Sequence, residues 1–512
     1  MTRVGIALGW IVFLASLPST VVGQSQTAGG SHKAGDIVLE EATLTTLETG
    51  AVNFELGTLY VPENRNDSNS RIIGIGFARF KALQPTGAPP QFHLPGGPGD
   101  SFLTGLKQDN KGLAARLKSY ELYRRAGDVV IMDQRGHSER GEVLKFERPI
   151  PAQPLDKPGS LARSSAAIVE ASRAVVAEYS AKGVDLRGYT VLECADDVDD
   201  LRKALRYERI TLVATSYGSQ WSFALMRRHP DIVARALLSG VEPLNYGYDM
   251  PSHVFEAIRR MWWEAEQDSR LQPYLPRGGL MAAAQTIVER LTRAPVTVEV
   301  KDEKTGHTSK VTLGVEDFQE SFLSNSRPVP LLSIYYSHYD NWARGVSAER
   351  REPRTEEALI RPSIDTSLGV TPRRLYLLRT DPAKEFLGHW DWDADVSTAD
   401  IWPSADVGDE LRTDIMSRIP VVFAEGDWDT STPIENTFYT APFFLNSRVL
   451  IAERGGHGVL WPIAQNNPEV MAALLEFLRT GKMDDIPARV TLPKPDFGVP
   501  DFPPPQARAT GK

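Results

Sequence analysis

The sequence is poor in cysteine and shows no large excess of one charge. Cys194 is the only cysteine among 512 residues, so an internal disulfide bond and a cysteine-rich metal cluster are both excluded. Fifty-seven Lys and Arg against 66 Asp and Glu give a net charge of −9, which argues against a general nucleic-acid-binding protein. Hydrophobic residues make up 41% and charged residues 24%, which is ordinary globular usage and excludes a disordered or fibrous chain.

Long hydrophobic runs are also missing, apart from one at the N-terminus. This uncharged stretch, 4–22, follows Arg3 and is followed by the small residue Gly23. A basic start, a short apolar core and a small-residue cut are typical of a secretory signal. We therefore expect residues 1–23 to be removed and the protein to be secreted or periplasmic, without stable membrane insertion. The alternative is an uncleaved membrane anchor, which Pro18 disfavours.

The sequence motifs of the common metal and nucleotide sites are absent as well. The chain has no His-Glu-x-x-His motif, no Cys-x-x-Cys pair and no Walker-type loop. We therefore expect no metal, no nucleotide and no other cofactor in the functional site. For its single cysteine, Cys194, we expect a buried and unreactive position.

What the sequence does contain is a series of short apolar strands that alternate with helical stretches. Two β-rich segments, 52–61 and 71–80, flank a run of turn residues and predict a hairpin. Downstream, the alternation of strands and amphipathic helices predicts βαβ units and a mostly parallel sheet. We expect its strands at 91–94, 128–132, 210–214, 236–239, 419–424 and 447–452.

The strand pattern stops between residues 245 and 410. Helical patterns rich in Arg, Glu and aromatic residues fill this interval, around one hairpin-like stretch at 296–313. Because the strand signals on both sides suit one sheet, we predict an α/β fold interrupted by an inserted helical cap. The predicted divisions are a signal peptide (1–23), the first part of the core (24–244), the cap (245–410), the second part of the core (411–485) and a Pro-rich tail (486–512).

The clearest chemical motif is Ala214-Thr-Ser-Tyr-Gly218, which follows a predicted strand and opens a predicted helix. This is the setting of a nucleophile elbow, in which a strained serine presents its hydroxyl at the edge of the sheet. Gly218 provides the small residue that the turn needs two positions after Ser216. The N–H of Tyr217, at the helix N-terminus, would face a developing oxyanion. The simpler alternative is that Ser216 only caps the helix.

A serine nucleophile needs a base and an orienting carboxylate, which follow it in the chain order serine, acid, histidine. His457 lies in a glycine-flanked loop after the last predicted strand. The segment Glu425-Gly-Asp-Trp-Asp-Thr-Ser-Thr-Pro433 follows an earlier strand and offers two aspartates, Asp427 and Asp429. We favour Asp429 because it lies further into the turn, where it can reach the histidine loop. Asp427 is the alternative.

A glycine-rich segment, Pro95-Gly-Gly-Pro-Gly99, ends another predicted strand. Glycines let the backbone approach a substrate closely, and we assign the second oxyanion donor to Gly97. The alternative is an ordinary tight loop. In the motif Asp133-Gln-Arg-Gly136, we expect a scaffolding role, with Asp133 and Arg135 as an internal pair that shapes this loop.

Taken in order, these motifs resemble the α/β-hydrolase serine peptidases, and within them the proline iminopeptidase and tripeptidyl aminopeptidase family. The resemblance covers about 50–245 and 400–480 and implies an α/β-hydrolase fold with a cap, a Ser216–Asp429–His457 triad and exopeptidase action. It rests on Gly-Gly-Pro-Gly (96–99), Asp-Gln-Arg-Gly (133–136), Thr-Ser-Tyr-Gly (215–218), Gly-Asp-x-Asp-x-x-Thr-Pro (426–433) and Gly-Gly-His-Gly (455–458).

Three positions depart from the pattern of this family. Pro95 stands where the family has histidine, with His93 two residues earlier, while Ala214 and Ser219 replace glycines. None of these changes removes a catalytic group, although each is expected to reshape the pocket. Exopeptidases of this family bind the free α-amino group with acidic side chains on the cap side. Our candidate for this role is Glu242, and the alternative is an exposed surface carboxylate.

The sequence thus predicts a serine hydrolase that acts on a peptide or a small acyl substrate. The resemblance favours an aminopeptidase of prolyl or tripeptidyl type. A carboxylesterase or another acyl hydrolase is the first alternative, because fold and triad do not fix the acyl substrate. A non-catalytic binding protein of the same fold is the second, although such proteins normally lose a triad residue. Nucleic acid is not an expected partner.

Overall fold

The computed structural model describes residues 32–108, 110–301, 306–355, 358–388 and 396–505. The predicted signal peptide, 1–23, lies outside the described residues. In the described part, no helix is both long and apolar enough to cross a membrane.

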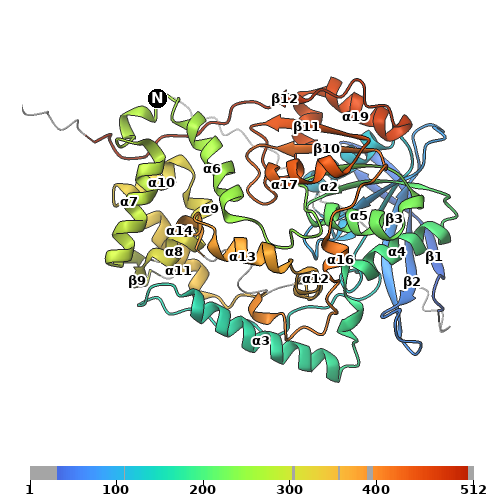
Figure 1. Cartoon of the computed structure of the whole chain (residues 1–512), viewed down its shortest axis with the longest axis horizontal. Coiled ribbons are helices and arrows are strands. Elements are labelled where there is room, and N and C mark those ends of the chain that lie inside the picture. The colour runs from blue at the N-terminus through green and yellow to red at the C-terminus, as the bar shows by residue number, and fades with distance from the viewer. Residues whose placement is uncertain (1–31, 109, 302–305, 356–357, 389–395, 506–512) are drawn as a thin grey trace, which may run out of the picture.

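A ten-stranded sheet forms the centre of the core (Figure 1). Its strands are β1 (Ile37–Thr46), β2 (Gly50–Pro62), β3 (Ile72–Phe80), β4 (Gln91–Leu94), β5 (Val129–Met132), β6 (Ile210–Thr215), β7 (Val233–Ser239), β10 (Val421–Gly426), β11 (Ser447–Glu453) and β12 (Arg489–Thr491). They lie in the order β1-β2-β3-β5-β4-β6-β7-β10-β11-β12. The first three strands and β5 pair in antiparallel fashion, whereas all the other pairs are parallel. The predicted mostly parallel sheet is therefore confirmed, as is the β2–β3 hairpin.

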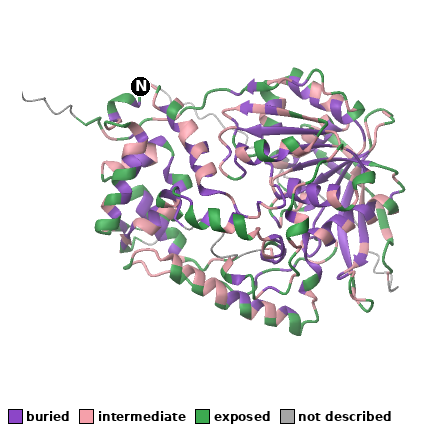
Figure 2. Cartoon of the chain, viewed as in Figure 1, coloured by how far each residue is buried: buried purple, intermediate pink, exposed green. Residues whose placement is uncertain are grey.

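Successive residues of the central strands pack against helices on opposite faces of the sheet, as the two-residue period of a strand requires. On β6, Leu212 and Ala214 join one apolar cluster, whereas Val213 joins the other. The helices of the core are α1 (Phe102–Gly105), α2 (Asn110–Tyr123), α3 (Leu161–Ala181), α4 (Val191–Ala204), α5 (Tyr217–Arg228), α17 (Ile434–Thr440), α18 (Leu460–Asn466) and α19 (Pro468–Thr480), with short 3-10 turns η1 (Leu186–Gly188), η2 (Pro230–Ile232) and η4 (Ala441–Phe443). Buried residues concentrate along the strands (Figure 2). Cys194, on α4, is among them, as predicted, and burial raises its pKa to about 12, which disfavours the reactive thiolate.

Between β7 and β10 the chain leaves the large sheet and forms a separate, mostly helical cap (Figure 1). The cap has its own apolar core, which includes Trp262 and Phe322. Its elements are α6 (Pro251–Ala265), η3 (Gln272–Tyr274), α7 (Gly279–Arg293), the hairpin β8 (Val296–Lys301) and β9 (Thr308–Leu313), α8 (Val315–Glu320), α9 (Phe322–Asn325), α10 (Pro328–Tyr335), α11 (Asp340–Arg351), α12 (Ile360–Leu368), α13 (Pro372–Thr380), α14 (Lys384–Leu387) and α16 (Asp409–Arg412). One of these, α12, packs its apolar side against the core instead.

The C-terminal tail connects the core to the cap. It leaves β12 and runs across to the cap helices (Figure 1). There Phe497 and Phe502 pack against the cap core, and the Tyr274 hydroxyl donates to the Phe502 carbonyl at 2.9 Å. The ring of Phe497 also lies 6.3 Å from that of Trp428, in the loop after β10. The tail therefore contacts both the cap and a loop of the core.

Candidate active site

Ser216 lies in the sharp turn between β6 and α5. Its backbone angles are φ 62° and ψ −138°, a left-handed conformation that is strained for a residue with a side chain. Its N–H lies 3.1 Å from the Ser239 carbonyl and 3.0 Å from the Gly240 carbonyl, just after β7. Its side chain makes no capping hydrogen bond to α5. The neighbouring strand thus stabilises the strained turn, and the alternative of a simple helix cap does not describe this serine.

Two glycines allow the segments around Ser216 to approach closely. A Cβ at Gly218 would lie 2.4 Å from the Leu94 carbonyl oxygen, so α5 can pack on the end of β4 only with glycine there. Gly240, with φ +58°, was not among our predicted site residues. A Cβ at this position would lie 2.9 Å from His457 Cε1 and 3.1 Å from the Ser216 nitrogen. The ring and the serine backbone therefore meet at Gly240, which follows a strand directly in the sequence.

His457 is held by Asp429. The imidazole Nδ1–H donates to Asp429 Oδ2 at 2.8 Å. The other oxygen, Oδ1, accepts from the N–H groups of Ser431 (2.8 Å) and Thr432 (3.0 Å), and the Thr432 hydroxyl donates to Oδ2 at 2.7 Å. Because the carboxylate is fully buried and bonded on both oxygens, it fixes the orientation of the ring.

The neighbouring aspartate, Asp427, has a different partner. Its carboxylate accepts from the backbone N–H of Arg454 at 2.7 Å, and its carbonyl accepts from Arg260 at 2.7 Å. It thus links the loop after β10 to the start of the histidine loop and to α6 of the cap. The structure brings Asp429, and not Asp427, into contact with the imidazole.

The electrostatic surroundings of His457 favour its protonated form. Burial lowers its pKa, but the hydrogen bond and the charge of Asp429, followed by the charges of Asp249 and Asp100, raise it above the ordinary histidine value. An imidazolium that forms when the ring takes a proton from Ser216 is therefore stabilised. Among the described residues, no hydrogen bond joins the Ser216 hydroxyl to the ring. Such bonds often tighten only when a substrate is bound.

The glycine-rich loop after β4 lies against Ser216. Gly97 has φ +106°, and a Cβ there would lie 2.5 Å from the Gly99 nitrogen, so the loop requires glycine at this position. A Cβ at Gly96 would lie 3.4 Å from Ser216 Cβ. In the described part of the chain, the N–H groups of Gly97 and Tyr217 donate to no other backbone carbonyl or side chain. Both remain available to an oxyanion.

Gln134 supports this loop, a role that we did not predict. Its side-chain oxygen accepts from the Gly99 N–H at 3.0 Å, and its nitrogen donates to the Gly96 carbonyl at 2.9 Å. The expected pair between Asp133 and Arg135 is wrong. Asp133 accepts from the Ser101 hydroxyl at 2.9 Å, whereas Arg135 binds Asp197 of α4 at 2.6 Å.

The difference has a simple physical cause, since each of these buried charged groups needs its own partners. Asp133 also accepts from the Leu103 N–H at the start of α1, whereas Arg135 also donates to two backbone carbonyls. The motif therefore ties the oxyanion loop to α1 on one side and α4 on the other. Its role is scaffolding, as expected, but Asp133 and Arg135 act through separate partners instead of pairing with each other.

Glu242 follows β7, and its backbone N–H donates to the Ser219 hydroxyl at 2.9 Å. It is not an exposed surface carboxylate, because it is partly buried. Burial raises the pKa of Glu242 well above its usual range, and the charges of Asp249, Asp365 and Asp429 raise it further, against Arg361. The cap contributes to this acidic cluster, since Asp365 belongs to α12. We call Glu242, Asp249 and Asp365 the acidic cluster.

A further carboxyl group, Glu425, lies at the end of β10, just before the loop that carries Asp427 and Asp429. It is buried, and its side chain accepts from the Val241 N–H at 2.9 Å and from the Thr437 hydroxyl at 3.1 Å. Burial, followed by the charge of Asp429, raises the pKa of Glu425 well above its usual range. It thus connects β10 to the loop that carries Glu242. The sequence offered one signal for it, a third carboxylate in the same motif as Asp427 and Asp429.

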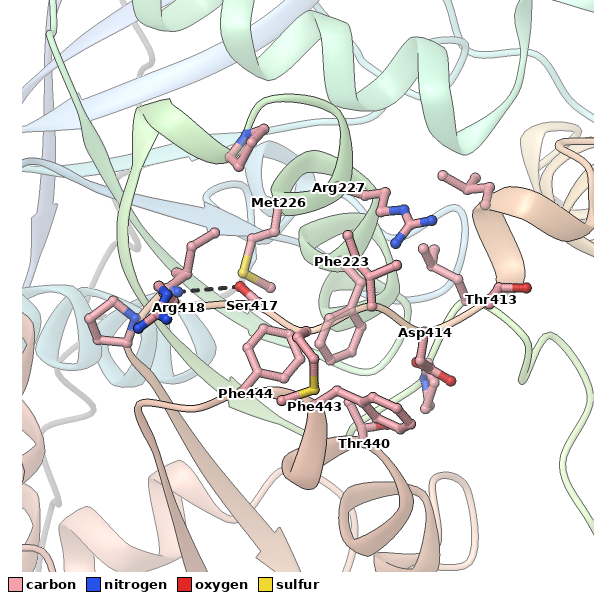
Figure 3. Close-up of a pocket in the computed structure, with 18 of the residues that line it drawn as sticks. Phe223, Met226, Arg227, Thr413, Asp414, Ser417, Arg418, Thr440, Phe443 and Phe444 are labelled. Carbon is pink, nitrogen blue, oxygen red and sulfur yellow. Dashed lines mark hydrogen bonds between the residues drawn. The ribbon is translucent and has the colours of Figure 1, made fainter.

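Two cavities lie near these residues, and the larger one is not the one that contains the catalytic side chains. A cavity of about 370 Å³ is lined by both Ser216 and His457. A larger one, of about 810 Å³, contains no triad residue; it lies beside the second half of α5, where Phe223 and Met226 face Phe444 and the segment 411–420 (Figure 3). Among the described residues, no group of His, Cys, Asp and Glu side chains is arranged to hold a metal ion.

Two family models match the chain. The model of the alpha/beta hydrolase fold matches residues 119–278, and the model described as TAP-like protein matches residues 389–489. No curated protein matches.

Among solved structures, the chain is similar to the proline iminopeptidase of Mycobacterium smegmatis, with 12% identity, coverage of 82% of this chain and 97% of the other, and a TM-score of 0.37. It is also similar to an esterase from Thermogutta terrifontis (14% identity, 82% and 98% coverage, TM-score 0.32). An esterase from Exiguobacterium antarcticum gives 13% identity, 82% and 98% coverage and a TM-score of 0.34. Likenesses this low do not choose between peptidase and esterase.

Proposed function

We propose that this chain, an α/β hydrolase with a TAP-like (tripeptidyl aminopeptidase-like) C-terminal segment, is a serine aminopeptidase of prolyl or tripeptidyl type. The observation that carries the proposal is the acidic cluster beside the triad. We also propose, from the N-terminal sequence, that the enzyme acts in a secreted or periplasmic location after loss of residues 1–23.

In the proposed reaction, Ser216 attacks the scissile carbonyl carbon while His457 takes the hydroxyl proton. Asp429 holds the ring and stabilises the imidazolium. The N–H groups of Gly97 and Tyr217 donate to the oxyanion of the tetrahedral intermediate. As that intermediate collapses, His457 returns the proton to the leaving amine and an acyl-enzyme remains. Water, activated by the same histidine, then releases the N-terminal product.

The acidic cluster supports a substrate that carries a positive charge. Burial, followed by the charges of Asp249 and Asp365, raises the pKa of Glu242 and disfavours its negative form, with Arg361 as an opposing charge. The α-ammonium group of a peptide would stabilise the negative form of these carboxyl groups when it binds. A buried ammonium is costly unless a carboxylate meets it, so the cluster would also offset the desolvation of the substrate. A free N-terminus is therefore the substrate feature that this side of the site suits best.

The test is hydrolysis of matched peptide amides with free and N-acetylated termini. Acetylation removes the cation and leaves the carboxylates without it, so we expect a discrimination of at least ~2 kcal/mol, or about thirtyfold in kcat/KM. The two substrates are compared at equal concentration over a panel of aminoacyl and tripeptidyl amides. Equal rates, or good turnover of p-nitrophenyl esters alone, would favour the carboxylesterase alternative instead.

A further inference from the structure

Helix α6 of the cap contacts the two loops that carry the catalytic acid and base. The acid loop (427–433) follows β10 and leads into α17, and the histidine loop (454–459) follows β11. Side chains four residues apart lie on the same face of a helix, and on α6 two such side chains are those of Arg260 and Glu264. Each of them contacts one of the two loops.

Arg260 contacts the acid loop. Its Nε donates to the Asp427 carbonyl at 2.7 Å. Its two terminal nitrogens donate to the carboxylate of Glu435, in the first turn of α17, at 2.8 and 3.3 Å. The guanidinium therefore binds both the start of the loop that contains Asp429 and the helix that follows this loop.

Glu264 contacts the histidine loop. Its carboxylate accepts from Arg454 Nε at 2.9 Å and lies 2.8 Å from Arg454 Nη2, which is the parallel geometry of a bidentate pair. Arg454 has φ +66°, a conformation in which glycine would avoid a steric cost, and it comes just before Gly455 and Gly456. The contacts of its side chain therefore explain an arginine at this place better than its backbone does.

The two loops are also joined to each other. The Arg454 N–H donates to Asp427 Oδ1 at 2.7 Å. Asp427 lies two residues before Asp429, and Arg454 lies three residues before His457. A shift of one loop along the other would therefore disturb the hydrogen bond of 2.8 Å between Asp429 and His457.

These two ion pairs differ from most surface pairs, which contribute little. The four side chains are only 23–28% exposed, and both pairs are bidentate. Each arginine also donates to a backbone carbonyl, Arg260 to that of Asp427 and Arg454 to that of Leu492 at 3.1 Å. Contacts with such fixed geometry restrain the loops to which they are attached.

We propose that Arg260 and Glu264 are positioning residues, which keep the two loops in the relative position at which Asp429 meets His457. The triad is then complete only while α6 of the cap is in place. The inference rests on the triad chemistry proposed above, but not on the choice of a peptide as the substrate. Because a misplacement of about 1 Å can cost roughly a hundredfold in rate, small movements of these loops have measurable effects.

The first measurement is the rate at which a small organophosphonate modifies Ser216. This reaction needs His457 but no recognition of an amine. We expect Glu264→Gln and Arg260→Met each to lower the rate by about tenfold, which is part of the loss that a full misplacement can cause.

The matched control is Arg259→Gln. The partners of this arginine, Glu256 and Trp263, both belong to α6, so its replacement removes an ion pair from the same helix without affecting either loop. Its rate should equal that of the wild type. An equal loss in this variant would show that any weakening of α6 lowers activity, and it would overturn the proposal.

A second measurement follows the hydrogen bond between Asp429 and His457 directly, by proton NMR of the imidazole Nδ1–H. The resonance is assigned through its loss in Asp429→Asn. In Glu264→Gln it should shift or broaden, which a change in overall stability alone would not cause. This signal also separates the inference from the proposed function: if the phosphonate labels a different serine, the nucleophile is wrong, and the resonance still decides whether α6 positions the pair.

A double-variant cycle tests whether Glu264 acts through Arg454. The loss of rate in Glu264→Gln/Arg454→Gln should be no larger than that in Arg454→Gln alone, because both changes remove the same ion pair. Losses that multiply would overturn the proposal, as would an unchanged rate or an unchanged resonance in Glu264→Gln. Thermal unfolding establishes that the variants are folded. If Arg260→Met does not fold, Glu264→Gln and the cycle decide.

Discussion

The two sides of Ser216 are built from different kinds of group. On one side, a mostly apolar cavity of about 370 Å³ is lined by residues of β4, α2 and α18, together with Asp100. On the β7 side, Glu242 lies with carboxylates contributed by the cap. One catalytic serine thus adjoins both a mostly apolar cavity and a group of carboxylates that suits positive charge. In the proposed function, the core provides the chemistry, while the segments around the triad select the substrate.

Replacement of the nucleophile, Ser216, should remove activity on every substrate. Ser216→Ala should retain less than ~1% of wild-type turnover of both peptides and esters, because triad losses usually cost several orders of magnitude. An organophosphonate should label Ser216 alone, as mass spectrometry of peptide digests can show. Labelling of a different serine would contradict the assignment of the nucleophile.

The second prediction distinguishes the roles of Asp427 and Asp429, the two aspartates in the loop after β10. Asp429→Asn should lower kcat by about three to four orders of magnitude, because the ring loses the partner that fixes its tautomer. Asp427→Asn is the matched control and should cost far less, since Asp427 bonds a backbone N–H of the histidine loop. Steady-state kinetics of the two variants give the ranking, and the reverse order would show that Asp427 is the catalytic acid.

The third prediction concerns the acidic cluster alone. Glu242→Gln removes the carboxyl group that can ionise when the proposed ammonium binds, so kcat/KM for free-amine peptides should fall by about tenfold to a hundredfold, the range of a charged hydrogen bond. N-acetylated peptides should react as they do with the wild type. Glu469→Gln, which removes the same charge from an exposed position on α19, is the control. An equal loss for free and blocked peptides would rule out this role for Glu242.

The smallest effect is expected in the pH dependence of kcat/KM. His457 must be neutral to accept the serine proton, so a raised pKa moves the acid limb of kcat/KM above the pH expected for an ordinary histidine. Asp100 is one of the charges that raise this pKa, and Asp100→Asn should therefore shift the limb to lower pH. A pH profile of kcat/KM checks the direction, and a shift to higher pH would contradict it.

The features that depend on neighbouring residues could be predicted from the sequence. The turn at Ser216 needs a strand before it, a helix after it and glycine at 218, and all of these are local patterns. The alternation of strands with helices likewise predicted the parallel sheet. Elements whose patterns are weaker were missed, namely β1 and β12 at the two edges of the sheet and the long helix α3.

Contacts between residues that are distant in the sequence depend on the whole fold and could not be predicted in this way. Gly240 and His457 are far apart in the sequence, yet the ring packs on this glycine because β7, β10 and β11 lie next to one another in the sheet. The partners of Asp133 and Arg135, the support from Gln134 and the surroundings of Glu242 likewise depend on chain segments brought together by folding. A sequence motif fixes the backbone conformation over a few residues, whereas burial and charge depend on the rest of the fold, and these set the partners and the pKa of each side chain.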